Sequence, residues 1–195
     1  MAESTVVVFV PGLRDHVDDH WQTLLAARLQ RTACVPRLGR HVLSIATWAR
    51  ALEDTLAAIE GPVYLAAHSA GALIVAQWAR QSRRPIVGAL LATPPDLGAP
   101  LPAPYPSLET FAVNGWLPVP RTRLPFPSIV AASRNDPIGD FDRVSALAAG
   151  WGATLHDAGH VGHLNGASGF GEWPQAPGLL QSLGLSPTAL TRIAA

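Results

Sequence analysis

The stretch VYLAAHSAG, residues 63–71, carries the signal from which the rest of the chain can be interpreted. Its first residues are apolar and favour a strand, whereas residues 72–79 contain nothing that breaks a helix. The sequence therefore predicts a strand, a tight turn with Ser69 at its apex, and a helix. Small residues are needed two positions before and after such a serine, because strand and helix backbones approach closely there. Ala67 and Gly71 occupy those positions.

A serine at such a turn is typical of the nucleophile elbow, usually written G-x-S-x-G. There a strained turn lifts Oγ above a parallel sheet, and the N-terminus of the following helix points at it. Ala67 stands where the pattern usually has its first glycine. Alternatively, Ser69 is only the N-cap of the helix, a role that serine favours. The short motif does not separate the two interpretations, and the rest of the chain has to supply the context.

Length and composition indicate one folded domain spanning residues 1–195. The chain is 48% hydrophobic and 14% charged, which excludes a disordered protein. Its formal net charge is zero and its pI is near 7.1, so no basic field favours nucleic acid or an anionic membrane surface. A neutral small molecule is the expected partner. A protein partner is compatible with the sequence, but no motif identifies one.

The sequence also bears on location. Cys34 is the single cysteine, so no internal disulfide can form, which is consistent with a reducing compartment. The apolar run 6–10 is too short for a signal-peptide core and lacks basic residues before it. No apolar run is long enough to span a bilayer. We therefore expect a soluble, cytoplasmic protein.

Strands and helices are expected to alternate along the chain. Apolar, β-branched runs predict buried strands at 6–10, 63–66, 85–92 and 128–132, and weaker patterns predict strands at 42–45 and 153–156. Apolar residues at helical spacing predict helices near 21–29, 47–59, 72–79, 141–148 and 176–183. This alternation predicts an α/β fold with a mostly parallel sheet and helices on both faces.

Capping residues predict where the helices begin and end. The expected N-caps are Asp18 or Asp19 for the first helix, Thr47 for the second and Asp140 for the helix after strand 128–132. The expected stops are Gly61 and Gly150.

Residues 93–127 interrupt the alternation. Prolines at 94, 95, 100, 102, 104, 106, 118, 120, 125 and 127 exclude long regular elements. So long a loop is often a functional cover, and it could form a lid or one wall of a substrate pocket. A well-packed irregular connection anchored by Phe111, Trp116 and Leu117 is an equally good interpretation.

A serine nucleophile needs a general base, and the base needs an acceptor that orients it. In α/β-hydrolases the acid and then the histidine follow the serine, each on a loop after a later strand. Asp136 directly follows strand 128–132, and His163 follows the strand near 153–156. These residues are the expected acid and base for Ser69.

Other residues compete for both roles. Asp96 lies after strand 85–92 and Asp157 lies in the loop of the histidine, but the loop of Asp136 is shorter and better suited to hold a carboxylate still. His160 competes with His163, and spacing does not separate them. His68 adjoins the serine, and its side chain is expected to point away from Oγ and to pack.

The negative charge that develops on a substrate carbonyl oxygen needs donors. The backbone N–H groups of Ala70, after the serine, and of Leu13, in the loop after strand 6–10, are expected to supply them. The acidic and histidine-rich cluster 15–20 has no zinc-like spacing and is explained by capping and solvation. Cys34 has no strand-to-helix turn around it. We therefore predict no metal, no cofactor and no catalytic thiol.

With these residues in place, the chain resembles the small serine-hydrolase family that includes retinoblastoma-binding protein nine and its bacterial YdeN-like relatives. The resemblance rests on segments 10–12, 20–22, 61–71, 89–96, 133–137, 162–165 and 168–174. It implies an α/β-hydrolase fold without a large cap domain and a triad of Ser69, Asp136 and His163. The Gly-His-hydrophobic-Asn segment 162–165 selects His163 over His160, but the resemblance fixes no substrate.

The sequence thus predicts a serine hydrolase that cleaves a small-molecule ester, thioester or activated amide. Ser69 would attack the carbonyl, His163 would relay the proton and Asp136 would orient His163. Transfer of the acyl group to an acceptor other than water is not distinguished from hydrolysis. The alternative from another class is a catalytically weak, hydrolase-like scaffold that binds a protein partner or ligand.

Overall fold

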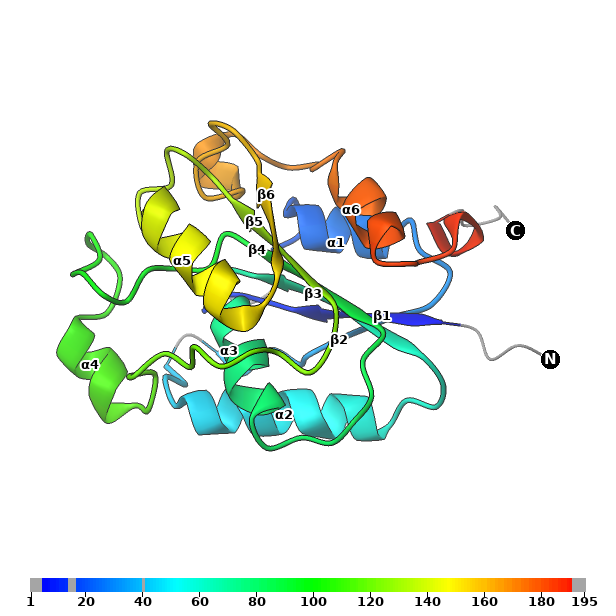
Figure 1. Ribbon diagram of the computed structural model, residues 1–195, viewed down its shortest axis with the longest axis horizontal. Coiled ribbons are helices and arrows are strands. Elements are labelled where there is room, and N and C mark those ends of the chain that lie inside the picture. The colour runs from blue at the N-terminus through cyan, green and yellow to red at the C-terminus, as the bar shows by residue number, and fades with distance from the viewer. Residues whose placement is uncertain (1–4, 14–16, 40, 191–195) are drawn as a thin grey trace.

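Parallel strands form a six-stranded sheet through the middle of the molecule, in the order β2-β1-β3-β4-β5-β6 (Figure 1). The computed structural model describes residues 5–13, 17–39 and 41–190. The strands are β1 (Val6–Val10), β2 (Thr32–Cys34), β3 (Val63–His68), β4 (Gly88–Ala92), β5 (Ser128–Ala132) and β6 (Thr154–Asp157). The helices are α1 (Trp21–Ala26), α2 (Ile45–Ala57), α3 (Ala70–Ala79), α4 (Leu108–Val113), α5 (Phe141–Trp151) and α6 (Ala176–Ser182), with 3₁₀ turns η1 (Gly166–Ser168) and η2 (Pro187–Leu190).

Helices cover both faces of the sheet, because alternate residues of the central strands point to opposite sides. Val8 and Val10 of β1 face a core built with α2, α3 and α5. Val7 and Phe9 face a second core built with α1 and α6. Figure 1 shows α2 and α3 on one side of the sheet and α1 and α6 on the other. The predicted α/β fold with helices on both faces is confirmed, and the described residues form a single small domain without a large cap.

The strand order reverses between β1 and β3, which are paired in register from Val6 and Val63 to Val10 and Ala67. In open parallel sheets, ligands bind beyond the carboxyl ends of the strands at such a reversal. Gly12 follows the end of β1 and Ser69 follows the end of β3. The topology therefore brings the predicted serine to the part of the sheet where a ligand site is expected.

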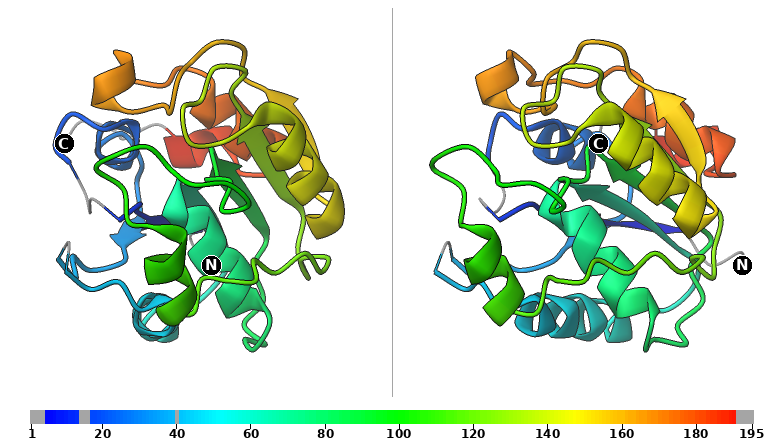
Figure 2. Two further views of the ribbon diagram at one scale, coloured as in Figure 1. Left: turned by 90° about the vertical axis from the view of Figure 1, so that its left-hand side faces the viewer. Right: turned by 60° about the vertical axis from the view of Figure 1, so that its left-hand side comes forward.

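Segment 93–127 runs from β4 to β5 and contains the short helix α4. Both views of Figure 2 show this segment, in green, beside α3. Its side chains Phe111 and Trp116 are buried in the core on that side and meet edge to face, with ring centroids 5.7 Å apart. The Nε1–H of Trp116 donates to the carbonyl of Leu43 at 2.6 Å. Regular structure is short here, as the prolines predicted, and aromatic packing anchors the segment.

The predicted strand at 42–45 is wrong. The carbonyls of Val42 and Leu43 accept bonds from the indoles of Trp48 and Trp116, and helix α2 begins at Ile45. The second strand is instead β2, which pairs with β1 at the edge of the sheet. Its residues are mostly exposed, so no apolar run marks it in the sequence.

Several helix boundaries also differ from expectation. The N-cap of α1 is His20, not Asp18 or Asp19, because the helix begins at Trp21 and the imidazole accepts from the backbone of Gln22. The remaining differences are that Ser44, not Thr47, caps α2 and that Gly152, at φ +65°, ends α5 in place of Gly150. Gly150 is needed for a close approach instead, since a Cβ there would lie 2.9 Å from the carbonyl oxygen of Arg121. The predicted cap Asp140 is confirmed.

Candidate active site

Ser69 lies in a strained turn between β3 and α3. Its backbone angles are φ 56° and ψ −128°, a combination that residues with side chains rarely adopt. The turn is held because the Ser69 N–H donates to the carbonyl of Ala92 at the end of β4, at 2.9 Å. Ser69 occupies the N-cap position of α3, but its side chain makes no capping hydrogen bond. The capping interpretation therefore does not account for the serine, and Oγ is available for another partner.

Two glycines permit the close approach of backbone segments around Ser69. A Cβ on Gly71 would lie 2.4 Å from the carbonyl oxygen of Val10 and 2.7 Å from that of Pro11, so the start of α3 crosses directly over the end of β1. A Cβ on Gly12 would lie 3.1 Å from the Cβ of Ser69. The small residue after the serine was predicted correctly. The backbone that Gly71 approaches is that of β1, however, a different strand from the one that carries the serine.

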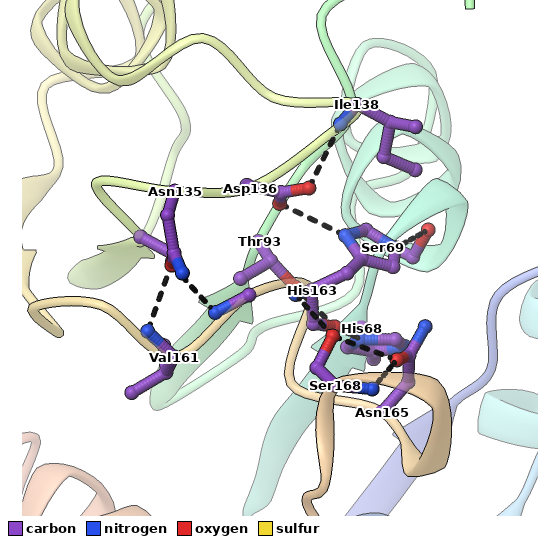
Figure 3. A network of polar contacts seen from close by, with 12 residues as sticks. His68, Ser69, Thr93, Asn135, Asp136, Ile138, Val161, His163, Asn165 and Ser168 are labelled. Carbon is purple, nitrogen blue, oxygen red and sulfur yellow. Dashed lines mark hydrogen bonds and ion pairs between the residues drawn. The ribbon is translucent and has the colours of Figure 1, made fainter. Parts of the chain in front are cut away.

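Ser69, His163 and Asp136 form a continuous chain of hydrogen bonds (Figure 3). The Ser69 Oγ lies 2.8 Å from Nε2 of His163, and Nδ1 of His163 lies 2.8 Å from Oδ2 of Asp136. An ionised carboxylate only accepts, so Nδ1 carries the ring proton and Nε2 is left to accept from the hydroxyl. The side chains of His163 and Asp136 are 4% and 2% exposed. Water therefore competes little for these contacts.

The competing acids have partners elsewhere. Asp96 pairs with Arg143 at 2.9 Å and accepts from the backbone of Gly98. Asp157 pairs with Arg134 at 2.6 Å, and this partner lowers the pKa of the Asp157 carboxyl. Neither carboxylate bonds to a histidine of the triad. Of the three candidate acids, Asp136 is the one whose carboxylate lies beside the imidazole of His163.

The competing histidines are also separated by the structure. His160 is exposed, whereas His163 is buried against the serine. His68 points away from Oγ, as expected, and its Nε2 lies 2.8 Å from the carbonyl oxygen of His163. Burial, with smaller effects from His163 and His20, lowers the pKa of His68 well below 6.5. His68 is therefore a neutral donor that holds the backbone of His163, which is more than the packing role expected from sequence.

Sequence reasoning missed the residue that joins the two loops. The Oδ1 of Asn135 accepts from the N–H of Gly162 at 2.7 Å and from the hydroxyl of Ser133 at 3.0 Å. The Ser133 hydroxyl in turn accepts from the N–H of Val161. The loop of Asp136 is thus tied to the loop of His163 (Figure 3). An asparagine beside the acid is a signal for a turn, but its partner is not visible in the sequence.

A second polar cluster supports His163 from its own loop. The N–H of His163 donates to the Oγ of Ser168 at 2.9 Å, and Oδ1 of Asn165 accepts from both the N–H and the hydroxyl of Ser168. Asp136 is fixed similarly, because its Oδ1 accepts from the N–H of Ile138 at 3.0 Å. The side chains of His163 and Asp136 are therefore held in place by polar groups of their own loops.

Ser69 and His163 open into a cavity of about 360 Å³. Leu13 and Ala70, whose N–H groups are the predicted oxyanion donors, both line it. Phe111 and Trp116 line the same cavity while they anchor segment 93–127. The two interpretations of that segment therefore combine, because one set of side chains serves as core and as pocket wall.

The other sequence features lie away from this chemistry or outside the described residues. Asp15 and His16 of the cluster 15–20 fall outside the described residues, and no group of three metal-ligating side chains occurs within 5–13, 17–39 and 41–190. Cys34 is exposed at the end of β2 and does not line the cavity. Over the same part of the chain, no helix is both long and apolar enough to cross a membrane.

Comparisons with known proteins show the family and the fold. Residues 7–182 match the family model described as serine hydrolase. A YdeN-like hydrolase from Pectobacterium atrosepticum is 29% identical, with a TM-score of 0.77, over 96% of this chain and 93% of that chain. The ydeN product of Bacillus subtilis is 20% identical, with a TM-score of 0.70, over 94% of this chain and 100% of that chain.

A third similar structure is a hydrolase of the α/β superfamily from Xanthomonas campestris. It is 20% identical to this chain, with a TM-score of 0.56, over 94% of this chain and 99% of that chain. No curated protein gives a significant sequence match. The predicted α/β-hydrolase fold is confirmed by these structures.

Proposed function

Because the chain belongs to the serine hydrolase family, we propose that it hydrolyses a small-molecule ester, thioester or activated amide through an acyl-enzyme on Ser69. The observation that carries the proposal is the hydrogen-bonded chain from Oγ of Ser69 through His163 to Asp136. A hydroxyl alone is a weak nucleophile, and this chain is the arrangement that activates it. The hydrolase relatives support hydrolysis as the overall reaction.

In the first half of the reaction, Oγ of Ser69 attacks the substrate carbonyl carbon while its proton moves to Nε2 of His163. The carbonyl oxygen gains the negative charge of the tetrahedral intermediate, and the N–H groups of Leu13 and Ala70 would donate to it. Asp136 stabilises the imidazolium cation and keeps Nδ1 protonated. When the bond to the leaving group breaks, Nε2 returns its proton to the departing atom.

In the second half, a water molecule takes the place of the leaving group. His163 accepts a proton from it as it attacks the acyl carbon, and the ester bond to Ser69 breaks. The proton then passes from Nε2 to Oγ, which restores the hydroxyl and releases the carboxylic acid. The triad and two backbone N–H groups would provide every proton transfer in this reaction and stabilise each charge that develops.

A fluorophosphonate probe tests the proposal, because it reacts covalently with an activated serine. We expect the wild-type protein to be labelled at Ser69 and Ser69→Ala to be unlabelled. Ser128→Ala is the matched control, since Ser128 is also buried and its hydroxyl donates to the carbonyl of Phe126, away from the cavity. This control should be labelled like the wild type.

The same experiment has a clear negative result. A folded wild-type protein that takes up no probe and turns over no p-nitrophenyl ester would contradict the proposal. It would favour the alternative of a hydrolase-like scaffold that binds a partner or ligand.

A further inference from the structure

The cavity beside Ser69 has two halves with different chemistry. One half is apolar and is formed by Leu73 of α3 with Leu97, Leu101, Phe111 and Trp116 of segment 93–127. These side chains belong to the core with α2, α3 and α5, or pack against it.

The other half of the cavity is polar. It is formed by Asp19, His20 and Gln22, before and within α1, and by Asn165 after β6. Leu164, next to His163 in this loop, belongs instead to the core with α1 and α6. The two halves therefore lie toward opposite faces of the sheet.

The chemistry of the proposed reaction decides which part of a substrate meets which half. The leaving group receives a proton from Nε2 of His163, so it must depart on the side of that imidazole and of Asn165. The carbonyl oxygen must face the N–H groups of Leu13 and Ala70. The remaining substituent on the carbonyl carbon is the acyl chain, and the space left for it is the apolar half.

Of the aromatic side chains that segment 93–127 places at the cavity, Phe111 and Trp116 present no free polar group to an acyl chain, whereas Tyr105 carries a hydroxyl. The Nε1–H of Trp116 is used by the carbonyl of Leu43, at 2.6 Å. Among the described residues that line the apolar half, none carries a charged side chain. A carboxylate or ammonium group on the acyl chain would therefore lose its hydration without gaining a partner of opposite charge.

From these observations we propose that the substrate is a neutral ester of a hydrophobic acid, whose acyl group lies between Leu73 and the aromatic pair Phe111 and Trp116. This inference rests on the proposed function and specifies its substrate class. A cavity of about 360 Å³ is at the small end of ligand pockets, which span roughly 300–1,000 Å³. An atom group the size of water takes up roughly 30 Å³. The part of the ligand inside the cavity then has about a dozen non-hydrogen atoms, of which roughly six to ten belong to the acyl group.

The test is a series of p-nitrophenyl esters in which only the acyl group changes: acetate, hexanoate, phenylacetate, dodecanoate and hemisuccinate. Each methylene buried in an apolar pocket changes an affinity by about fourfold. We expect kcat/KM for hexanoate and phenylacetate to exceed that for acetate at least ~10-fold, and dodecanoate to fall below hexanoate. Hemisuccinate matches hexanoate in size but carries a charge, so we expect at least ~10-fold lower kcat/KM for it than for hexanoate.

Two cavity variants distinguish the halves. Leu101→Trp fills part of the apolar half from a half-buried position and should lower the ratio of hexanoate to acetate kcat/KM at least ~10-fold. Ala167→Trp is the matched control, because Ala167 is exposed and lines the cavity beside Asn165. It should leave the order of acyl preference as in the wild type.

The results separate this inference from the proposed function. Probe labelling of Ser69 with turnover that is fastest for acetate or hemisuccinate would overturn the inference and leave the proposed function intact. An equal loss of acyl preference in Leu101→Trp and Ala167→Trp would also overturn it. The absence of labelling and of turnover for every ester would overturn both. The wild-type series alone decides the question if a variant does not fold.

Discussion

The same substitution at two helical glycines should change stability in opposite directions. Alanine stabilises a helix relative to glycine by about 1 kcal/mol when nothing else changes. In Gly71→Ala, however, the new Cβ would lie 2.4 Å and 2.7 Å from the carbonyl oxygens of Val10 and Pro11. Both are backbone atoms at the end of a buried strand, so α3 or β1 must move. In Gly178→Ala, within α6, no atom lies within 4 Å of the new Cβ.

The expected magnitudes follow from these distances. Overpacking that shifts backbone costs about 1–3 kcal/mol or more, so Gly71→Ala should lower the free energy of unfolding by roughly 2–4 kcal/mol. In a chain of this length each kcal/mol moves Tm by roughly 2–4 °C. We expect Tm to fall by roughly 4–16 °C in Gly71→Ala and to rise by roughly 2–4 °C in Gly178→Ala.

Thermal unfolding followed by circular dichroism measures both changes, and the esterase assay adds a second readout. Because Gly71 sets how α3 approaches β1, its variant should also displace Ser69 and lose turnover, whereas Gly178→Ala should keep wild-type turnover. A Gly71→Ala protein as stable as the wild type would refute the close approach of the two backbones, and with it our explanation of how the serine is positioned.

Three further predictions concern the residues around the triad. Asp136→Asn should lower kcat about 10³–10⁴-fold while Asp96→Asn, which removes the partner of an exposed arginine, stays close to wild type in the same assay. Asn135→Ala should lower kcat about tenfold with little change in KM, because the loops of the acid and the base lose two hydrogen bonds. Asn135→Asp keeps the accepting oxygen and should recover most of the rate. His68 has a folded-state pKa well below its unfolded value of 6.5, so in acid the unfolded protein binds a proton at His68 that the folded protein does not. The contribution of His68 to the free energy of unfolding should therefore be intact above about pH 6.5 and lost as the pH falls below it, which urea titrations at several pH values measure. The free energy of unfolding should depend less steeply on pH in His68→Gln. An unchanged pH dependence would mean that protonation of His68 does not cause the loss of stability in acid.

The sequence was most informative where chemistry and local geometry require particular residue types. The elbow around Ser69 needs small neighbours, and the acid and histidine must follow later strands, so these positions could be predicted. The buried strands β1, β3, β4 and β5 could be predicted as well, because both faces are covered and apolar runs result.

The elements that sequence reasoning missed depend on contacts between distant parts of the chain. The edge strand β2 is held by pairing with β1 and has no apolar pattern of its own. The carbonyls of Val42 and Leu43 are used by two tryptophan indoles, one of them far along the chain. The bond from Asn135 to Gly162 joins two loops whose proximity only the folded sheet creates. Such contacts are decided by tertiary structure, which local propensity does not encode.

The backbone of Ser69 has a consequence for how this protein could change over time. Its dihedral angles suit glycine far better than serine, and holding a side chain there costs on the order of 1–3 kcal/mol. A glycine at this position would relax the turn and remove the hydroxyl, so Ser69→Gly should be inactive and have a higher Tm than the wild type. Selection for stability alone would therefore favour loss of this hydroxyl, and the proposed turnover is what would oppose that loss.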